Sequence, residues 1–292
     1  MADPGLKRKL AGGEFFLAPG VFDMMSTLMA NRVGFDCVYA SGFWLTASYL
    51  GIPDAGLATY TDMLNRVSRV VELSEAPVIA DADTGFGGLL NLRETVRGYE
   101  RAGVSGFQLE DQEFPKKCGH TPNRRVVPMQ QMTLRLKVAL DTRVDEDMLI
   151  IGRTDARTGE GLDEAIDRAQ RMAELGVDLV FIEALETVDE MQRVCRDVPG
   201  PLMANMVNSG STPFCSASQL EEMGFACAIF PATASLAANA AVERALRRLK
   251  NVGTCGADTV PLFDFAEFCK VIGFDDVWAF EEKWVDDPGS ER

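Results

Sequence analysis

The sequence predicts an α/β fold, a single (β/α)8 barrel of the TIM type, and three observations support this prediction. Short apolar runs alternate along the chain with stretches that carry apolar residues at three- and four-residue spacing, which is typical of strands joined by helices. The runs are apolar throughout, as in parallel strands that are buried on both faces. Eight such units follow one another, a number that favours a closed barrel over an open sheet.

The eight expected strands are short, and each is followed by a polar or glycine-containing segment and then a helical stretch. An open doubly wound sheet, the alternative, would need a glycine-rich phosphate turn directly after its first strand. The segment TGFGG at 84–88 instead follows the third strand and lacks the GxGxxG spacing. The expected strands lie near 15–18, 37–40, 78–80, 106–109, 149–152, 179–182, 202–204 and 227–230. The expected helices include 92–102, 129–141, 162–175 and 232–249.

The chain beyond Gly253 lies outside the eight units. We expect one barrel domain over 1–292, with 254–292 as a helical extension, because no linker or compositional break divides the sequence. The extension carries more aromatic side chains than one barrel needs to close, and large apolar surfaces usually mark an interface. We therefore expect its helices to pack on the barrel or on a partner subunit. The aromatic residues are Phe263, Phe265, Phe268, Phe274, Trp278, Phe280 and Trp284.

Charge and cysteine content limit the partners and the compartment. The formal net charge of -15 argues against nucleic acids and anionic membrane surfaces, because phosphate polymers are bound through clustered Lys and Arg. No signal-peptide core begins the sequence, and no segment approaches 18 uninterrupted apolar residues. The 7 cysteines lack the spacing of a disulfide framework, which suits a reducing compartment. We expect a cytoplasmic protein that acts on a small molecule.

Polar residues follow most of the expected strands, and in such a barrel these strand ends converge on one face. Several are acids, and their mutual repulsion is costly unless a cation lies among them. Carboxylates without a second histidine indicate an oxygen-only site, so we expect Mg²⁺ or Mn²⁺ rather than Zn²⁺. An arginine among them can bind a substrate carboxylate with two hydrogen bonds. In chain order, the residues at these strand ends are Ser41, Gly42, Asp81, Asp83, Glu110, Asp111, Arg153, Asp155, Glu183, Asn205, Pro231 and Thr233.

The segment 110–120, with the sequence EDQEFPKKCGH, follows the fourth expected strand. It contains Cys118 and His120, and His120 is the only histidine in the chain. A neutral-pH proton carrier of the imidazole type could therefore only be His120. The alternative is a solvated loop in which the cysteine and histidine are incidental, but the acids at the neighbouring strand ends favour a functional segment. Lys116 and Lys117 would add positive charge that tunes the acidity of the thiol.

The sequence resembles the isocitrate lyase and phosphoenolpyruvate mutase superfamily over nearly its whole length. KKCGH is the mark of the carbon–carbon lyase branch of that family. The resemblance implies Mg²⁺ held directly by Asp83 and through water by Asp81 and Glu110, with a mobile loop that carries Cys118. It also implies a homotetramer in which terminal helices are exchanged between neighbours. The matching stretches are YASG (39–42), LGIPD (50–54), ADADTGFG (80–87), EDQEFPKKCGH, GRTDA (152–156), IEA (182–184) and NMVNSGSTP (205–213).

The reaction implied by the resemblance is cleavage of a 2-hydroxy acid between C2 and C3, and the chemistry assigns roles to the residues. Arg153, His120 and the backbone at Ser41 and Gly42 are expected to stabilise the negative charge of the carbanion beside a carboxylate. Cys118 is the expected acid that protonates this carbanion, with Lys116 beside it. The base is either Tyr39 or a water on the metal. The products would be a 2-oxo acid such as pyruvate and a second carboxylate.

Substrate choice is predicted from a difference. Relatives that use tricarboxylates have an arginine after the eighth strand, and this chain has Leu236 there. A leucine cannot pair a third carboxylate, so we expect a C4 to C6 dicarboxylate of the 2,3-dimethylmalate kind, with 2-methylisocitrate less favoured. Its methyl groups would contact Phe43, Trp44 and Leu236. The other expected substrate contacts are Ser41, Gly42, Glu183, Asn205, Thr212 and Pro231.

Three alternatives remain open from the sequence. An oxaloacetate hydrolase shares KKCGH, but the pattern of those enzymes has a serine at the position of Pro231. A phosphonate or phosphoenolpyruvate mutase would keep the acids but would not need an acid at Cys118. A non-catalytic barrel would show a damaged set of acids, whereas all of them and the cysteine are present.

Overall fold

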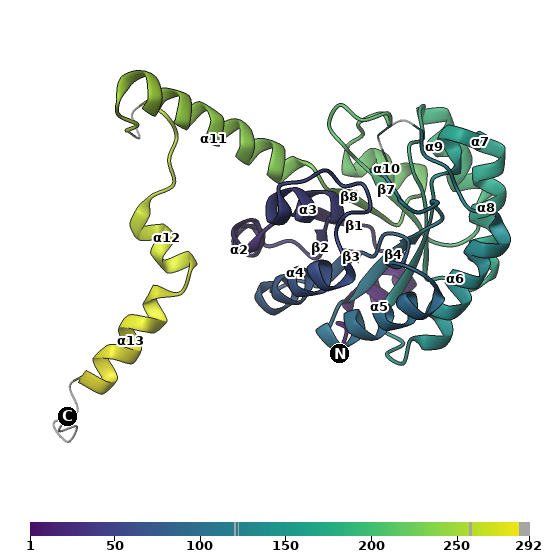
Figure 1. The fold of residues 1–292 in the computed structure, drawn as a ribbon, viewed down its shortest axis with the longest axis horizontal. Coiled ribbons are helices and arrows are strands. Elements are labelled where there is room, and N and C mark those ends of the chain that lie inside the picture. The colour runs from purple at the N-terminus through teal and green to yellow at the C-terminus, as the bar shows by residue number, and fades with distance from the viewer. Residues whose placement is uncertain (120, 122, 257–258, 286–292) are drawn as a thin grey trace. The chain divides into compact units, whose positions relative to one another are not determined.

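The structure is a computed structural model that describes residues 1–119, 121, 123–256 and 259–285. Eight strands form a closed barrel in chain order, and every strand is parallel to its neighbours (Figure 1). The barrel closes where β1 pairs with β8, with Phe16 opposite Cys227 and Pro19 opposite Phe230. The predicted barrel is therefore confirmed. The strands are β1 (Phe16–Val21), β2 (Val38–Ala40), β3 (Val78–Asp81), β4 (Gly106–Glu110), β5 (Leu149–Thr154), β6 (Leu179–Ile182), β7 (Leu202–Asn205) and β8 (Cys227–Phe230).

Helices follow the strands and surround the barrel (Figure 1). Local sequence sets several of their ends. The Asp23 side chain accepts a hydrogen bond from Ser26 N at the start of α2, and Thr59 does the same for Asp62 N at the start of α4. The helices of the barrel are α1 (Gly5–Gly12), α2 (Met24–Val33), α3 (Gly42–Leu50), α4 (Tyr60–Leu73), α5 (Leu89–Ala102), α6 (Met129–Thr142), α7 (Ala156–Glu160), α8 (Leu162–Glu174), α9 (Val188–Asp197) and α10 (Ala217–Met223).

Two buried clusters form the core, and together they determine where the site lies. One cluster lies in the interior of the barrel and includes Phe16, Tyr39, Ile151 and Phe181, together with Leu6 of α1. The other lies between the sheet and the helices. Because successive side chains of a strand point to opposite faces, the residue two positions beyond an interior one also points inward. Arg153 lies two positions after Ile151, so its side chain points into the barrel interior at the carboxyl end of β5.

The chain divides into two compact units, Met1–Ser235 and Leu236–Arg292. The division falls inside α11 (Thr233–Val252), and the second unit continues with α12 (Phe265–Val271) and α13 (Phe274–Val285). Within the second unit, aromatic rings pair along the chain, as between Phe274 and Trp278 at 5.7 Å. Phe265 and Phe280 remain 80% and 65% exposed. No helix in the described part of the chain is both long enough and apolar enough to cross a membrane.

Candidate active site

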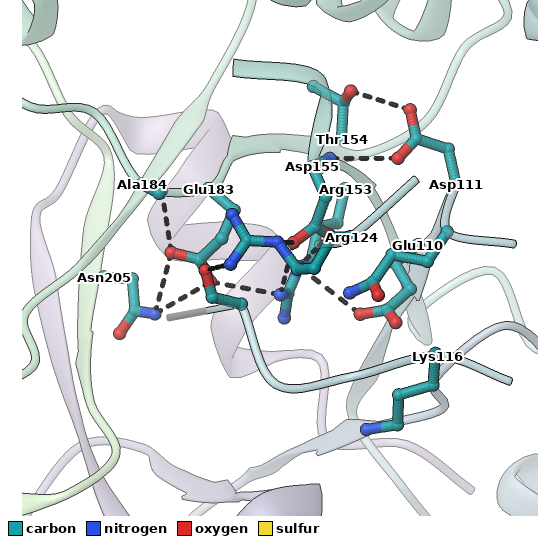
Figure 2. Close-up of polar contacts among 12 residues, drawn as sticks. Glu110, Asp111, Lys116, Arg124, Arg153, Thr154, Asp155, Glu183, Ala184 and Asn205 are labelled. Carbon is teal, nitrogen blue, oxygen red and sulfur yellow. Dashed lines mark hydrogen bonds and ion pairs between the residues drawn. The ribbon is translucent and has the colours of Figure 1, made fainter. Parts of the chain in front are cut away.

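The site is built around Arg153, at the carboxyl end of β5 (Figure 2). Its guanidinium binds Asp155 with two hydrogen bonds, from Nε at 2.9 Å and from Nη2 at 3.1 Å. Glu110 Oε2 lies 3.4 Å from Nε, and Glu183 Oε2 lies 3.2 Å from Nη2. Burial lowers the pKa of Arg153, but these carboxylates outweigh it and raise the pKa well above its usual value. Arg153 therefore holds a permanent positive charge in the barrel interior.

Asp155 is itself held in place from outside the barrel. Its backbone N donates to Asp111 Oδ1 at 2.9 Å, and Thr154 Oγ1 donates to Asp111 Oδ2 at 2.7 Å. Arg168 of α8 donates to the same Asp111 Oδ2 at 3.2 Å and to the carbonyl of Val127 at 2.8 Å. Burial raises the pKa of Asp111 to about 6, although its hydrogen bonds and Arg168 oppose the shift. The position of Arg153 is thus set by a chain of contacts that reaches an outer helix.

Glu183 and Asn205 lie beside Arg153, at the ends of β6 and β7. Asn205 Nδ2 donates to Glu183 Oε2 at 3.1 Å, and the backbone N of Ala184 donates to Glu183 Oε1 at 2.8 Å. Ala184 has a positive φ of 61°, a strained backbone conformation of the kind that occurs at functional sites. The structure therefore brings these two predicted substrate contacts next to the arginine.

A second cation, Lys116, lies among acids on the other side of the site. Its Nζ is 2.7 Å from Asp83 Oδ1 and 2.6 Å from Asp54 Oδ1. These carboxylates raise the pKa of Lys116 well above its usual value against the effect of burial. Burial raises the pKa of Asp83 to about 7, with Lys116 opposing the shift. Asp83 has a positive φ of 47°, and its backbone N donates to Asp81 Oδ1 at 3.0 Å.

The acids on this side suit a hard divalent cation. Glu110 is 2% exposed, yet its Oε1 has no hydrogen-bond partner among the described residues. The Lys116 ammonium shows that the oxygen of Asp83 accepts a cation at 2.7 Å. Among the described residues, no three His, Cys, Asp or Glu side chains lie close enough to ligate one ion together. An oxygen-only site with few direct ligands fits Mg²⁺, which keeps several of its waters.

Gly42 and Tyr39 border the acids. A Cβ at Gly42 would lie 2.7 Å from Asp81 Oδ2, so only glycine lets Asp81 lie against the start of α3. Tyr39 is buried, and burial together with Asp81 raises its pKa well above the usual value against the effect of Arg153. A raised pKa makes its phenolate hard to form at neutral pH, which weighs against Tyr39 as the base and favours it as a hydrogen-bond donor.

We define the Cys118 segment as residues 112–126 between β4 and α6, and its residue Gly119 lies against the arginine. Gln112 anchors its first part, because Nε2 donates to the carbonyl of Lys117 at 2.8 Å and Oε1 accepts from Lys117 N at 3.0 Å. A Cβ on Gly119 would lie 2.5 Å from Arg153 Nη2 and 2.6 Å from Glu183 Oε2. The backbone next to Cys118 therefore lies directly on the arginine side of the site. His120 lies outside the described residues.

The remaining predicted contacts are more scattered. Phe43 lies edge-on to Trp44 at 4.8 Å in α3. The backbone of Pro231 lies close to Gly20, because a Cβ added to Gly20 would lie 2.2 Å from the Pro231 carbonyl oxygen. Thr212 lines a small cavity with Asn205. Leu236 belongs to the second unit, so its predicted contact with substrate stays a prediction.

Two residues of the site were not predicted. Asp54 is the last residue of the LGIPD stretch, and the sequence patterns assign it no function at the site. Its position as an acid within a stretch that matches the family could have indicated one. Arg124 lies in the last part of the Cys118 segment, and its side chain is 3% exposed with Nε 3.4 Å from Asp155 Oδ1. Nothing in the sequence distinguishes it from the neighbouring Arg125.

Comparison with known proteins gives concordant results. A family profile described as phosphoenolpyruvate phosphomutase matches residues 6–260. The chain is 41% identical to a 2,3-dimethylmalate lyase of Eubacterium barkeri over 96% of this chain and 97% of that protein. It is 39% identical to a 2-methylisocitrate lyase of Aeropyrum pernix over 94% of this chain and 88% of that protein.

Solved structures resemble the whole chain as well. An oxaloacetate acetylhydrolase bound to the inhibitor 3,3-difluorooxalacetate has a TM-score of 0.90 and 32% identity, covering 96% of this chain and 95% of the other. A phosphonopyruvate hydrolase in complex with oxalate and Mg²⁺ has a TM-score of 0.86 and 28% identity, covering 98% of this chain and 100% of the other.

Proposed function

This chain belongs to the phosphoenolpyruvate mutase/isocitrate lyase superfamily, and from that membership we propose that it is a Mg²⁺-dependent carbon–carbon lyase. The proposed substrate is a 2-hydroxy dicarboxylate of the 2,3-dimethylmalate kind, and the products are a 2-oxo acid such as pyruvate and a second carboxylate. The observation that carries the proposal is the close approach of the Gly119 backbone to Arg153 and Glu183. It brings the segment that bears Cys118 next to a buried, permanently charged arginine. An acid at Cys118 is what a lyase needs and a mutase does not.

Bond cleavage makes three demands on the site. The 2-hydroxyl must lose its proton. The C2–C3 bond must break with its electron pair left on C3, and the resulting carbanion at C3 must be protonated. When bound, Mg²⁺ would supply a Lewis acid for the 2-oxygen and its neighbouring carboxylate, with Asp83, Asp81 and Glu110 as the residues that hold it. Lys116 forms ion pairs with Asp54 and Asp83 on the same side.

Arg153 and Cys118 meet the other demands in this proposal. As the bond breaks, charge moves onto the carboxylate beside C3, and the positive charge of the buried Arg153 guanidinium stabilises it in this proposal. The Cys118 thiol then gives its proton to C3, leaving a thiolate that takes a proton back before the next turnover. Because its raised pKa keeps Tyr39 protonated, Tyr39 acts as a hydrogen-bond donor to the substrate, and the proton of the 2-hydroxyl would go to the other candidate base, a water at the Mg²⁺ site.

The choice of substrate rests on Leu236 and on the relatives. A 2,3-dimethylmalate lyase is among the proteins that the chain resembles over nearly its whole length, and a leucine cannot pair a third carboxylate. Oxaloacetate hydrolysis is the second candidate, supported by the likeness to oxaloacetate acetylhydrolase. Pro231 weighs weakly against it, because it stands where the pattern of those enzymes has a serine.

A substrate panel tests the proposal. The purified protein with Mg²⁺ is assayed with 2,3-dimethylmalate, 2-methylisocitrate, oxaloacetate and phosphonopyruvate. We expect pyruvate release with the highest kcat/KM from 2,3-dimethylmalate. Oxalate release from oxaloacetate as the dominant activity would instead assign the hydrolase, and turnover of the phosphonate alone would assign the mutase branch.

We also propose that the protein is a cytoplasmic homotetramer that exchanges its terminal helices. α12 and α13 carry exposed aromatic rings, such as Phe265 and Phe280, and exposed apolar side chains in such number support an interface. All seven cysteines lie in the described part of the chain, and none forms a disulfide there, as suits a reducing compartment. Sedimentation velocity at micromolar concentration tests the assembly, and a monomer would contradict it.

A further inference from the structure

Arg124 has the contacts of a residue that fixes the Cys118 segment. Its Nη1 donates to the carbonyl of Thr121 at 3.0 Å and to that of Gly119, and the carbonyl of Cys118 lies at 3.5 Å. Thr121 adds two hydrogen bonds to the Cys118 carbonyl, from N at 3.0 Å and from Oγ1 at 2.7 Å. One guanidinium thus gathers three carbonyls of the segment that bears the thiol.

The other edge of the same guanidinium contacts α7 and Asp155, and Figure 2 labels Arg124 close to Arg153 and Asp155. Arg124 Nη2 donates to Thr158 Oγ1 of α7 at 2.5 Å, and Nε lies 3.4 Å from Asp155 Oδ1. That same Asp155 oxygen accepts from Arg153 Nη2 at 3.1 Å. Arg124 and Arg153 therefore share one carboxylate oxygen, so the backbone around Cys118 and the charge that stabilises the carbanion are tied to a common support.

We propose that Arg124 is a positioning residue that fixes Cys118 relative to Arg153. The inference deepens the proposed function, because it rests on Cys118 being the acid. A guanidinium suits the task since it is planar, always charged and carries five N–H donors in a rigid fork. A lysine has a single ammonium on a flexible stem, which cannot reach the loop carbonyls, Thr158 and Asp155 together. Arg124→Lys is therefore as informative as removal of the charge.

The neighbouring arginine is a matched control. Arg125 has the same chemistry, but its side chain is 82% exposed and pairs at 2.9 Å with Glu113, which is 42% exposed. Such a surface pair contributes little to stability. Arg125→Lys and Arg125→Met should leave turnover unchanged, so any effect at Arg124 belongs to its buried contacts rather than to the loss of one positive charge.

The first measurement is steady-state kinetics of Arg124→Lys and Arg124→Met, each checked for an unchanged melting temperature. Displacing a reacting group by about 1 Å costs about 10²-fold, so we expect kcat to fall by about 10²-fold. KM should change only about threefold, because Arg153 keeps its direct contacts with Asp155, Glu110 and Glu183. Guanidinium added to the assay should partly restore kcat in Arg124→Met but not in Arg124→Lys.

The second measurement does not depend on catalysis. Iodoacetamide labelling of Cys118 is followed by peptide mass spectrometry, with Cys269 of the second unit as an internal reference. We expect labelling of Cys118 to be about tenfold faster in both Arg124 variants and unchanged in the Arg125 variants. Unchanged labelling would overturn the inference, whatever happens to kcat. Faster labelling with wild-type kcat would keep Arg124 as the anchor of the segment and would instead remove Cys118 from the proposed reaction.

Discussion

The two cations of the site are held in different ways. Arg153 projects from a strand, and its main partner Asp155 is itself fixed through Asp111 and Arg168. Lys116 projects from the Cys118 segment, and its partners Asp54 and Asp83 lie in loops at the ends of other elements. A guanidinium in a rigid fork is suited to permanent positioning, and a point-like ammonium on a flexible stem is suited to replacement by another cation. We call these the arginine half and the lysine half of the site.

Metal removal should abolish the function of the lysine half and leave the contacts of the arginine half unchanged. We expect EDTA to abolish activity and Mg²⁺ or Mn²⁺ to restore it, because carboxylates and water are the ligands that these ions prefer. The melting temperature should change little in EDTA, since Lys116 still neutralises Asp83. Asp83→Ala should be inactive at every Mg²⁺ concentration. Full activity in EDTA would exclude the metal-assisted lyase.

Cys118→Ser tests the segment that joins the two halves. A serine hydroxyl is a far weaker acid than a thiol of similar size, so kcat should fall by about 10²–10⁴-fold. KM should change much less, because in the proposed function Arg153 and the backbone at Ser41 hold the carboxylates of the substrate. A variant that retains more than about a tenth of wild-type kcat would show that the thiol is not the acid.

Arg168→Met removes the contact of α8 with Asp111, which supports the arginine half of the site. Asp111 would lose the partner at 3.2 Å while remaining fully buried, and breaking a buried ion pair costs about 3–5 kcal/mol. Urea unfolding should show a loss of this size. Arg171, which is 56% exposed and pairs with Asp167 at 2.9 Å, provides the control on the same helix, and Arg171→Met should change the free energy of unfolding by less than about 1 kcal/mol. Equal losses at both positions would show that Asp111 does not depend on Arg168.

The pH dependence of stability offers a smaller and more specific test of the same support. Burial raises the pKa of Asp111 from 3.8 to about 6, so the folded state binds a proton that the unfolded state has released. Stability from this group is complete below pH 4 and is lost as pH rises to about 6, at up to about 1.4 kcal/mol per pH unit. The stability of the wild type relative to Asp111→Asn should therefore fall by about 2–3 kcal/mol over this range. A constant difference would contradict the raised pKa.

Periodicity explains which parts could be predicted. The apolar run at 227–230 predicts a strand with the same bounds as β8, and the convergence of strand ends in a barrel predicts that the acids and Arg153 lie on one face. The N-terminal helix α1 (Gly5–Gly12) was not expected, since its short, basic sequence has little apolar patterning. The helical stretch expected at 232–249 extends to Val252, where Gly253 with a φ of 76° ends it.

The missed site residues share a physical cause. Asp54 and Arg124 lie in loops, whose paths depend on tertiary contacts and not on a repeating pattern. Asp111 was placed among the strand ends, but its role as a support for Asp155 rather than a ligand depends on which side of the barrel wall it faces. Only the structure shows that the side chain of Arg124 is buried while that of Arg125 is exposed, because both are arginines in the same loop.

The contact of Gly119 has a consequence for anyone who wishes to redesign the enzyme. Because any Cβ would overlap Arg153 Nη2 and Glu183 Oε2, even alanine should displace the segment. In a saturation library selected for turnover, position 119 should retain only glycine. Phe114 in the same segment is 65% exposed and should accept many residues. Libraries aimed at new substrates should therefore leave position 119 unchanged and vary the segment's outer face.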